Sequence, residues 1–269
     1  MNAGVFYSSR AGRLLFQVIQ KTGGVKAAAW FLNTKPSRLM IPYYIKHNHI
    51  SLAGCEPKVY ESFADFFARK KCRPVTRRRP DTLISPCDGL FSCYPVTEDT
   101  GLFLKGSQYL ISDLVPDRQM ASAFAGGLAM IFRLEAHHYH HFCFFADGEL
   151  QETHFIPGQL HSVQPIACRS VPVYRLNRRW YHLMHTPAFG PAVQIEIGAM
   201  MVGGVTLTKD TGTFSMGEEM GNFELAGSTI VLLLTEDARR RLTRAGRLLP
   251  AADGGCEVPV AMGDVIGSL

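Results

Sequence analysis

Short apolar runs, each bounded by Gly, Pro or Asp, recur along the chain after Pro74. They are TLISP at 82–86, GLFSCYPV at 89–96, LAMIFRL at 128–134, AVQIEIGAMMVGGV at 192–205 and STIVLLL at 228–234. Each run has the length of a strand and is flanked by turn-forming residues. The pattern predicts a β-rich, mainly antiparallel domain over residues 73–269.

The first 72 residues have a helical pattern instead. Apolar positions share one face of residues 10–21, Gly23-Gly24 breaks the pattern, and a second apolar segment follows at 27–32. Pro36 and Pro42 are expected to limit helix beyond that point. The pattern predicts a short helical section that precedes the β-rich domain, and hence an α+β fold.

Residues 60–71, YESFADFFARKK, have the spacing of one more amphipathic helix. Phe63, Phe66 and Phe67 lie at positions i, i+3 and i+4, which share a helical face. We place the domain boundary after this segment. The two units are a helical, membrane-associating section at 1–72 and a catalytic domain at 73–269.

Charge and composition indicate the compartment of the protein and its contact with a membrane. The chain is 46% hydrophobic and 19% charged, enough to bury a core, and its net charge is +5. Basic residues cluster at 10–38 and 69–79, which suits anionic lipid headgroups or nucleic acid phosphates but is also typical of a solvated face. No apolar run approaches the roughly 20 residues of a membrane span. The seven cysteines form no CxxC pair, which favours a reduced compartment. We therefore expect peripheral contact with the cytoplasmic face of a membrane.

Four histidines and a cysteine fall within the seven residues 137–143. Imidazole titrates near neutrality and is the commonest acid–base group, and His and Cys are also zinc ligands. The spacing lacks HExxH or a paired CxxC, so zinc is only weakly indicated. If the segment is a strand, residues 138, 140 and 142 share one face and the odd-numbered residues the other. A polar strand edge is the plain structural alternative.

Two turns carry further candidates. Asp88-Gly89 follows one apolar run, where Asp-Gly is common turn chemistry. Gly227 precedes Ser228 at the start of the last long apolar run. Glycine leaves its own carbonyl open to attack, and the serine hydroxyl can then shift the acyl group from nitrogen to oxygen. A tight turn that enters a strand explains the same residues without any chemistry.

Several motifs, taken together and in order, resemble the phosphatidylserine decarboxylase family. The resemblance covers residues from about 40 to about 235. It rests on SFADFFARK at 62–70, SPCDG at 85–89, LKGSQYLISDLV at 104–115, YHHFC at 139–143, IPGQLHSVQPIA at 156–167, IEIGAMMVGGV at 195–205 and GEEMGNFELAGST at 217–229.

The resemblance implies that the chain cuts itself between Gly227 and Ser228. Ser228 would become a pyruvoyl group, the only cofactor, on the smaller of two chains made from one precursor. That group would decarboxylate phosphatidylserine to phosphatidylethanolamine and CO₂ without a metal. In the family an Asp-His-Ser triad drives self-cleavage, and Asp88 and Ser228 match two of its members. His140 matches the histidine linked to decarboxylation, and we assign it as the proton donor to the substrate carbon.

The chain departs from the family at one position of this triad. Where the family motif Y-H-x-F-H ends in histidine, this chain has Cys143. Cys143 could itself be the base if nearby imidazolium lowered its pKa, a histidine of 138–141 could replace it, or the chain could be unable to cleave. We favour retained activity because the segment around Ser228 is otherwise intact.

The remaining expectations concern the substrate and partners. His161 and Phe66 are predicted to contact the substrate, with Phe66 at the acyl entrance. The expected partners are phosphatidylserine, an anionic membrane surface and, from the family alone, a second copy of the chain; nucleic acid is not expected. The alternatives are a non-catalytic lipid-binding relative, a pyruvoyl decarboxylase of another amino-lipid or a soluble amino acid, and a zinc hydrolase built on the histidines.

Overall fold

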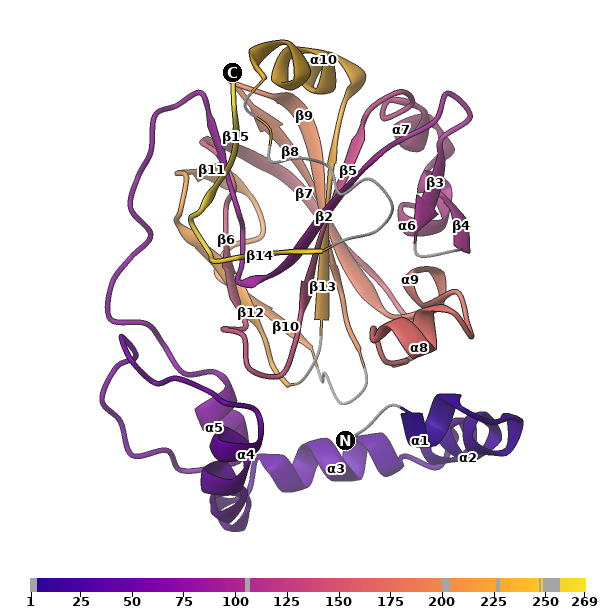
Figure 1. Ribbon diagram of the computed structural model, residues 1–269, viewed down its shortest axis with the longest axis vertical. Helices are drawn as coiled ribbons and strands as arrows, with labels where there is room; N and C mark the ends of the chain where they lie inside the picture. Colours follow the sequence, from indigo (N-terminus) through magenta and orange to yellow (C-terminus); the bar gives the residue numbers. More distant parts are fainter. Residues whose placement is uncertain (1–3, 105–106, 200–203, 226–227, 247, 249–256) are drawn as a thin grey trace.

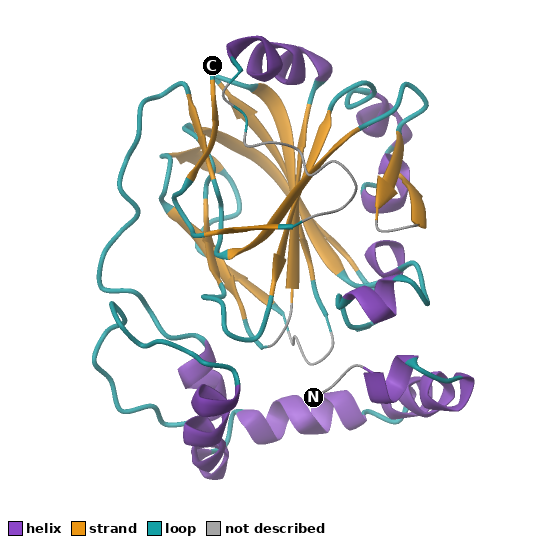
Figure 2. Cartoon of the chain, in the orientation of Figure 1, coloured by secondary structure: helices purple, strands orange, loops and turns teal. Residues whose placement is uncertain are grey.

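The computed structural model describes residues 4–104, 107–199, 204–225, 228–246, 248 and 257–269. Helices border a central body of strands (Figure 2). The N-terminal helices are α1 (Gly4–Tyr7), α2 (Arg10–Lys21), α3 (Gly24–Leu32), the 3₁₀ helix η1 (Lys35–Met40), α4 (Ile41–His47) and α5 (Phe63–Phe67). Those beyond them are α6 (Ile111–Leu114), α7 (Arg118–Ser122), α8 (Pro165–Cys168), α9 (Val173–Leu176) and α10 (Glu236–Ala245).

The strands form one large antiparallel sheet and three small ones. The large sheet has the order β11 (Gly212–Phe214), β7 (Gly148–Ile156), β8 (Arg179–Thr186), β9 (Gly190–Ile197), β13 (Ser228–Leu234), β5 (Leu128–Leu134), β2 (Gly89–Pro95) and β14 (Val258–Val260). A second sheet has the order β10 (Val205–Leu207), β12 (Glu219–Phe223) and β6 (His141–Cys143). Two-stranded sheets pair β1 (Thr82–Ile84) with β15 (Val265–Ser268) and β3 (Gly101–Leu104) with β4 (Ser107–Leu110). The predicted α+β class with a β-rich domain is confirmed.

The main core includes side chains between the large sheet and the sheet formed by β10, β12 and β6, together with side chains of α6, α8 and α9. All seven residues of β13 are buried. Its edges are paired with β5 and β9, and its side chains on both faces pack in the main core. Phe142 of β6 and Phe223 of β12 pack with their ring centroids 5.2 Å apart, and the Met220 sulfur lies 3.3 Å from the Gln194 amide of β9. Apolar side chains that stack between two sheets are the usual core of such an arrangement.

The N-terminal helices lie at the end of the large sheet where β13 begins (Figure 1). Tyr7 and Phe16 belong to the main core, so α1 and α2 pack directly on the domain. Phe66 and Phe67 of α5 form a second cluster that includes Leu225, three residues before Ser228. The helical section therefore packs against the segment that leads into β13; the boundary at residues 72/73 stays a prediction.

Two sequence expectations for this section were wrong. Pro36 and Pro42 lie in the first turns of η1 and α4 and do not end a helix. Proline is tolerated there because the N–H groups of a first turn have no partner within the helix. The helix predicted over 60–71 spans only Phe63–Phe67, since Cys55 and Lys71 form a β-bridge that holds the later residues extended.

Candidate active site

Ser228 is the first residue of β13 and is completely buried. It lies opposite Leu134 of β5, and among the described residues its hydroxyl has no hydrogen-bond partner. An unpaired buried hydroxyl costs about 1–3 kcal/mol, so a native protein rarely retains one without a reason. Gly227, the other half of the predicted cleavage site, lies outside the described residues.

Asp88 lies at the same end of the sheet as Ser228. Leu90 of β2 pairs with Arg133 of β5, which places Gly89 beside Leu134 and thus two strands, about 10 Å, from Ser228. Glycine at position 89 allows close packing of the two strands, because an added Cβ would lie 3.1 Å from the Arg133 carbonyl oxygen. The turn therefore brings Asp88 close to the start of β13.

The Asp88 carboxylate has three partners. Both of its oxygens lie 3.1 Å from the Lys71 ammonium, Oδ1 accepts from the Met262 N–H at 2.9 Å, and Oδ2 accepts from the Tyr139 N–H at 3.4 Å. No histidine side chain is among the hydrogen-bond partners described for it. The carboxylate is instead fixed by a cation and by two backbone groups.

His140 is the histidine whose environment suits a general base. It is completely buried against Phe67, with ring centroids 4.3 Å apart. Its Nδ1 lies 3.0 Å from the His138 carbonyl oxygen, and because that oxygen only accepts, Nδ1 carries the proton. Nε2 is then left with a free lone pair, and it has no partner among the described residues. Burial lowers the pKa of His140 to about 3, so the ring stays neutral.

The neighbouring histidines His138 and His141 have other hydrogen-bond partners. His138 Nδ1 accepts from the Glu135 N–H at 2.8 Å, and burial, followed by the His137 charge, lowers the pKa of His138 to about 4. Both ring nitrogens of His141 face acceptors, Glu219 Oε1 at 2.8 Å and the Ala68 carbonyl at 3.2 Å. The alternation predicted over 137–143 does not apply to 137–140, because the strand begins only at His141.

Cys143 has surroundings opposite to those that a thiolate base requires. It is buried with Ile84 and Met216 in a small apolar cluster, and its thiol points to the Ser85 carbonyl at 3.9 Å. Burial raises the pKa of Cys143 to about 12. The condition for Cys143 as the base was a pKa lowered by imidazolium, and the structure does not meet it, because loss of hydration on burial is the largest influence on this pKa.

The two residues predicted to contact substrate are both packed inside the protein. Phe66 is fully buried in the aromatic cluster of α4 and α5. The two ring nitrogens of His161 are engaged, by the Tyr7 hydroxyl at 2.9 Å and Gln159 Oε1 at 2.6 Å. In this arrangement His161 joins α1 to the domain, and its contact with substrate stays a prediction.

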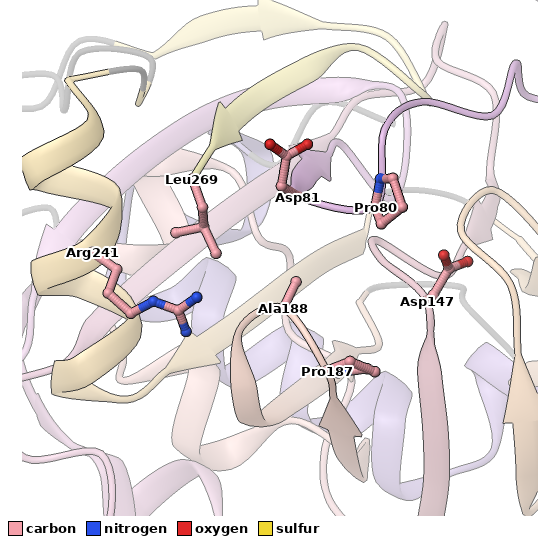
Figure 3. A pocket seen from close by; sticks show the side chains of 7 residues that line it. All are labelled: Pro80, Asp81, Asp147, Pro187, Ala188, Arg241 and Leu269. Carbon is pink, nitrogen blue, oxygen red and sulfur yellow. The ribbon is translucent and has the colours of Figure 1, made fainter.

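A pocket of about 540 Å³ lies beside α10, the helix that follows the last residue of β13, and Arg241 of α10 is part of its lining (Figure 3). Its lining includes Asp81, Asp147, Arg241 and Leu269 and none of the predicted site residues. Within the described part of the chain, no group of three or more His, Cys, Asp or Glu side chains could hold a metal ion.

Two contacts of this region could not be inferred from the sequence. In the sequence, Lys71 and Arg69 are only members of a basic run, yet Lys71 binds Asp88 and Arg69 Nη2 donates to the His138 carbonyl at 3.1 Å.

A fully buried pair lies on β8 and β9, where His182 Nε2 and Glu196 Oε2 are 2.5 Å apart. Glu196 faces Ile230, so it lies on the same face of the sheet as Ser228.

The structure brings a buried serine, a neutral imidazole and a carboxylate to the same end of the large sheet, and groups of these kinds are suited to acid–base chemistry. Comparison with known proteins gives the family. The model of the phosphatidylserine decarboxylase family matches residues 60–268.

Individual members of this family are similar in sequence to almost the whole chain. It is 34% identical over 264 residues to phosphatidylserine decarboxylase proenzyme 2 of Clostridium acetobutylicum, which covers 97% of this chain and 89% of the relative. It is 33% identical to the phosphatidylserine decarboxylase proenzyme of Clostridium kluyveri, with coverage of 97% and 90%. The chain belongs to the phosphatidylserine decarboxylase family, whose members are carboxy-lyases.

Proposed function

We propose that this chain is a proenzyme that cuts itself between Gly227 and Ser228 and then decarboxylates phosphatidylserine. The observation that carries the proposal is the buried, unpaired hydroxyl of Ser228 at the first position of β13. The products would be chains 1–227 and 228–269. They would stay together because β13 is paired along its length with β5 and β9 of the larger chain.

His140 is the base that we assign to self-cleavage. Its Nε2 takes the proton of the Ser228 hydroxyl as Oγ bonds to the Gly227 carbonyl carbon, and returns it to the backbone nitrogen as the C–N bond breaks. Loss of the Ser228 α-proton then expels the larger chain as a carboxylate. Water releases the nitrogen as ammonia and leaves a pyruvoyl group on the smaller chain.

The unpaired Ser228 position fits this group, since no described residue competes for its oxygen. When present, the pyruvoyl carbonyl supplies an electron sink for the electron pair released with CO₂. The chain's own residues then have to bind the lipid, exclude water and deliver one proton to the substrate carbon. His140 Nε2, buried beside Phe67, is the group that we assign to this last step. Because its lone pair is free, Nε2 would first take a proton from the ammonium group of the bound substrate and then pass that proton to the substrate carbon.

A carbon dioxide assay tests the activity. We expect CO₂ from phosphatidylserine vesicles and none from free serine, and we expect borohydride, which reduces the pyruvoyl carbonyl, to abolish it. Release from another amino-lipid alone would favour a different decarboxylase. Lipid binding without any CO₂ would favour a non-catalytic relative and contradict the proposal.

We further propose that the N-terminal helices rest on the cytoplasmic face of an anionic membrane. The first 55 residues contain no Asp or Glu and seven Lys or Arg. Large apolar side chains are exposed on the same segment: Leu14, Leu15, Val18, Trp30, Phe31, Leu39, Met40 and Tyr43. Basic charge beside exposed apolar groups is typical of interfacial binding. No helix in the described ranges is long and apolar enough to span a bilayer.

Introducing charge into this surface should release the protein from vesicles. Trp30 and Leu39 are 71% and 79% exposed, and burying one large apolar side chain is worth about 1.5–3 kcal/mol. We expect the Trp30→Glu/Leu39→Glu variant to bind vesicles of phosphatidylglycerol and phosphatidylcholine at least about tenfold more weakly in a flotation assay.

Val265→Glu is the matched control for this prediction. Val265 is an exposed apolar residue on β15, away from the N-terminal helices (Figure 1). The Val265→Glu variant should bind the vesicles as tightly as the unmodified protein does. Equal loss of binding in both variants would contradict the assignment of the surface to the N-terminal helices.

A further inference from the structure

One peptide group links Asp88 to His140. The N–H of Tyr139 donates to Asp88 Oδ2 at 3.4 Å, and the carbonyl of His138 accepts from His140 Nδ1 at 3.0 Å. These two groups belong to the same peptide unit, 138–139. In a trans peptide they point in opposite directions, so the carboxylate and the imidazole lie at the two ends of a single dipole.

Segment 69–71 holds this peptide from both sides. The Lys71 ammonium lies 3.1 Å from each Asp88 oxygen and 4.6 Å from the centroid of the Tyr139 ring. The Lys71 N–H also donates to the Tyr139 hydroxyl at 3.3 Å. Arg69, 4% exposed, donates to the same His138 carbonyl that receives His140. Lys71 thus fixes the carboxylate end of the dipole and Arg69 the carbonyl end.

We propose that Lys71 is a positioning residue for self-cleavage: by anchoring Asp88 it orients the 138–139 peptide, which in turn holds His140 with Nε2 free to accept the Ser228 proton. The inference rests on the proposed function and deepens it. It replaces a direct carboxylate–imidazole bond with one relayed through the backbone, in a chain that has Cys143 at the family's base position.

The physical basis is the tautomer of a neutral imidazole. A hydrogen bond from Nδ1–H to a backbone carbonyl decides that Nε2 carries the lone pair. A carboxylate at the N–H end of the peptide polarises it, so its carbonyl becomes a stronger acceptor for that bond. Lys71 is only about one-third exposed, and its contact with both carboxylate oxygens keeps Asp88 directed toward Tyr139. Loss of the ammonium frees Asp88 to turn away and weakens the preference for the required tautomer.

Three substitutions test the role of Lys71 in the full-length chain. Freshly translated protein is followed by gel and intact mass, and the first-order rate of cleavage is measured. We expect Lys71→Met to cleave about tenfold or more slowly, a fraction of the ~10²–10⁴-fold that a general base supplies. Lys71→Arg keeps the cation and should recover to within about threefold of the unmodified rate. Lys70→Met is the matched control, since Lys70 is exposed, and should cleave normally.

Nitrogen NMR of ¹⁵N-histidine in the uncleaved Ser228→Ala chain reports the tautomer directly. The His140 signal is identified by its loss in His140→Gln. We expect protonated Nδ1 in the parent chain and a mixture of tautomers after Lys71→Met. A Lys71→Met chain that cleaves at the normal rate overturns the inference. So does a Lys71→Met chain that cleaves slowly but keeps the parent tautomer of His140, if Lys71→Arg does not restore the rate. If the unmodified chain is never cut, it is the proposed function that fails.

Discussion

Ser228→Ala is expected to remain a single chain of about the full 29.8 kDa, whereas the unmodified protein yields chains 1–227 and 228–269. Without Oγ there is no atom to attack the Gly227 carbonyl, so the loss should be complete and not partial. The smaller chain of the unmodified protein should begin with a carbonyl that borohydride reduces. Intact mass spectrometry, before and after borohydride treatment, measures both properties in one sample.

Ser92→Ala is the control for the loss of a buried hydroxyl as such. Ser92 lies on β2, is 1% exposed, and its hydroxyl also has no partner among the described residues. It should be processed like the unmodified protein. Cleavage at the same bond in Ser228→Ala would show that Ser228 is not the nucleophile, and would leave its buried hydroxyl without explanation.

His140→Ala should slow self-cleavage by about two to four orders of magnitude, the usual contribution of a general base. The reason is geometric, since of His138, His140 and His141 only His140 has a ring nitrogen free to accept a proton. Cys143→Ala removes a buried thiol from an apolar cluster and should cleave within a few-fold of normal. Rates of precursor disappearance, measured by gel, separate the two residues.

The pH dependence distinguishes the two bases independently. The pKa of His140 is lowered to about 3, first by burial and further by Arg69, His138 and His141 around it. The imidazole is then neutral from about pH 5 to pH 8, and the cleavage rate should be flat there. A thiol with a pKa near 12 would instead give a rate that rises about tenfold per pH unit. A rising profile together with an uncut Cys143→Ala chain would assign the base to Cys143.

Sequence periodicity located four of the eight strands of the large sheet, and one strand of a small sheet. The runs that predicted strands correspond to β1, β2, β5, β9 and β13, because buried strands require continuous or alternating apolar residues. It did not predict α10, although Thr235 caps its first turn and Gly246, with φ of 63°, follows its last residue. Those capping signals were present in the sequence and could have located the helix.

The histidine segment shows where periodicity stops being informative. An alternating pattern assumes a strand, but residues 136–138 form a turn and 139–140 have no regular structure before β6, so neighbouring histidines face unrelated partners. The basic run at 69–79 was likewise seen as a cluster of charge. Only Lys71 among these residues binds Asp88, through an ion pair that joins segments 17 residues apart.

The sequence by itself determined the class of fold, the family, and the candidates Ser228, Asp88 and His140, since these follow from apolar spacing and from motifs that are local in the chain. Tertiary structure alone decided which imidazole keeps a free lone pair, how burial moves the pKa of Cys143, and how Asp88 reaches His140. These properties depend on hydration and on hydrogen bonds between segments distant in sequence, and both are set only when the two sheets and the N-terminal helices pack together.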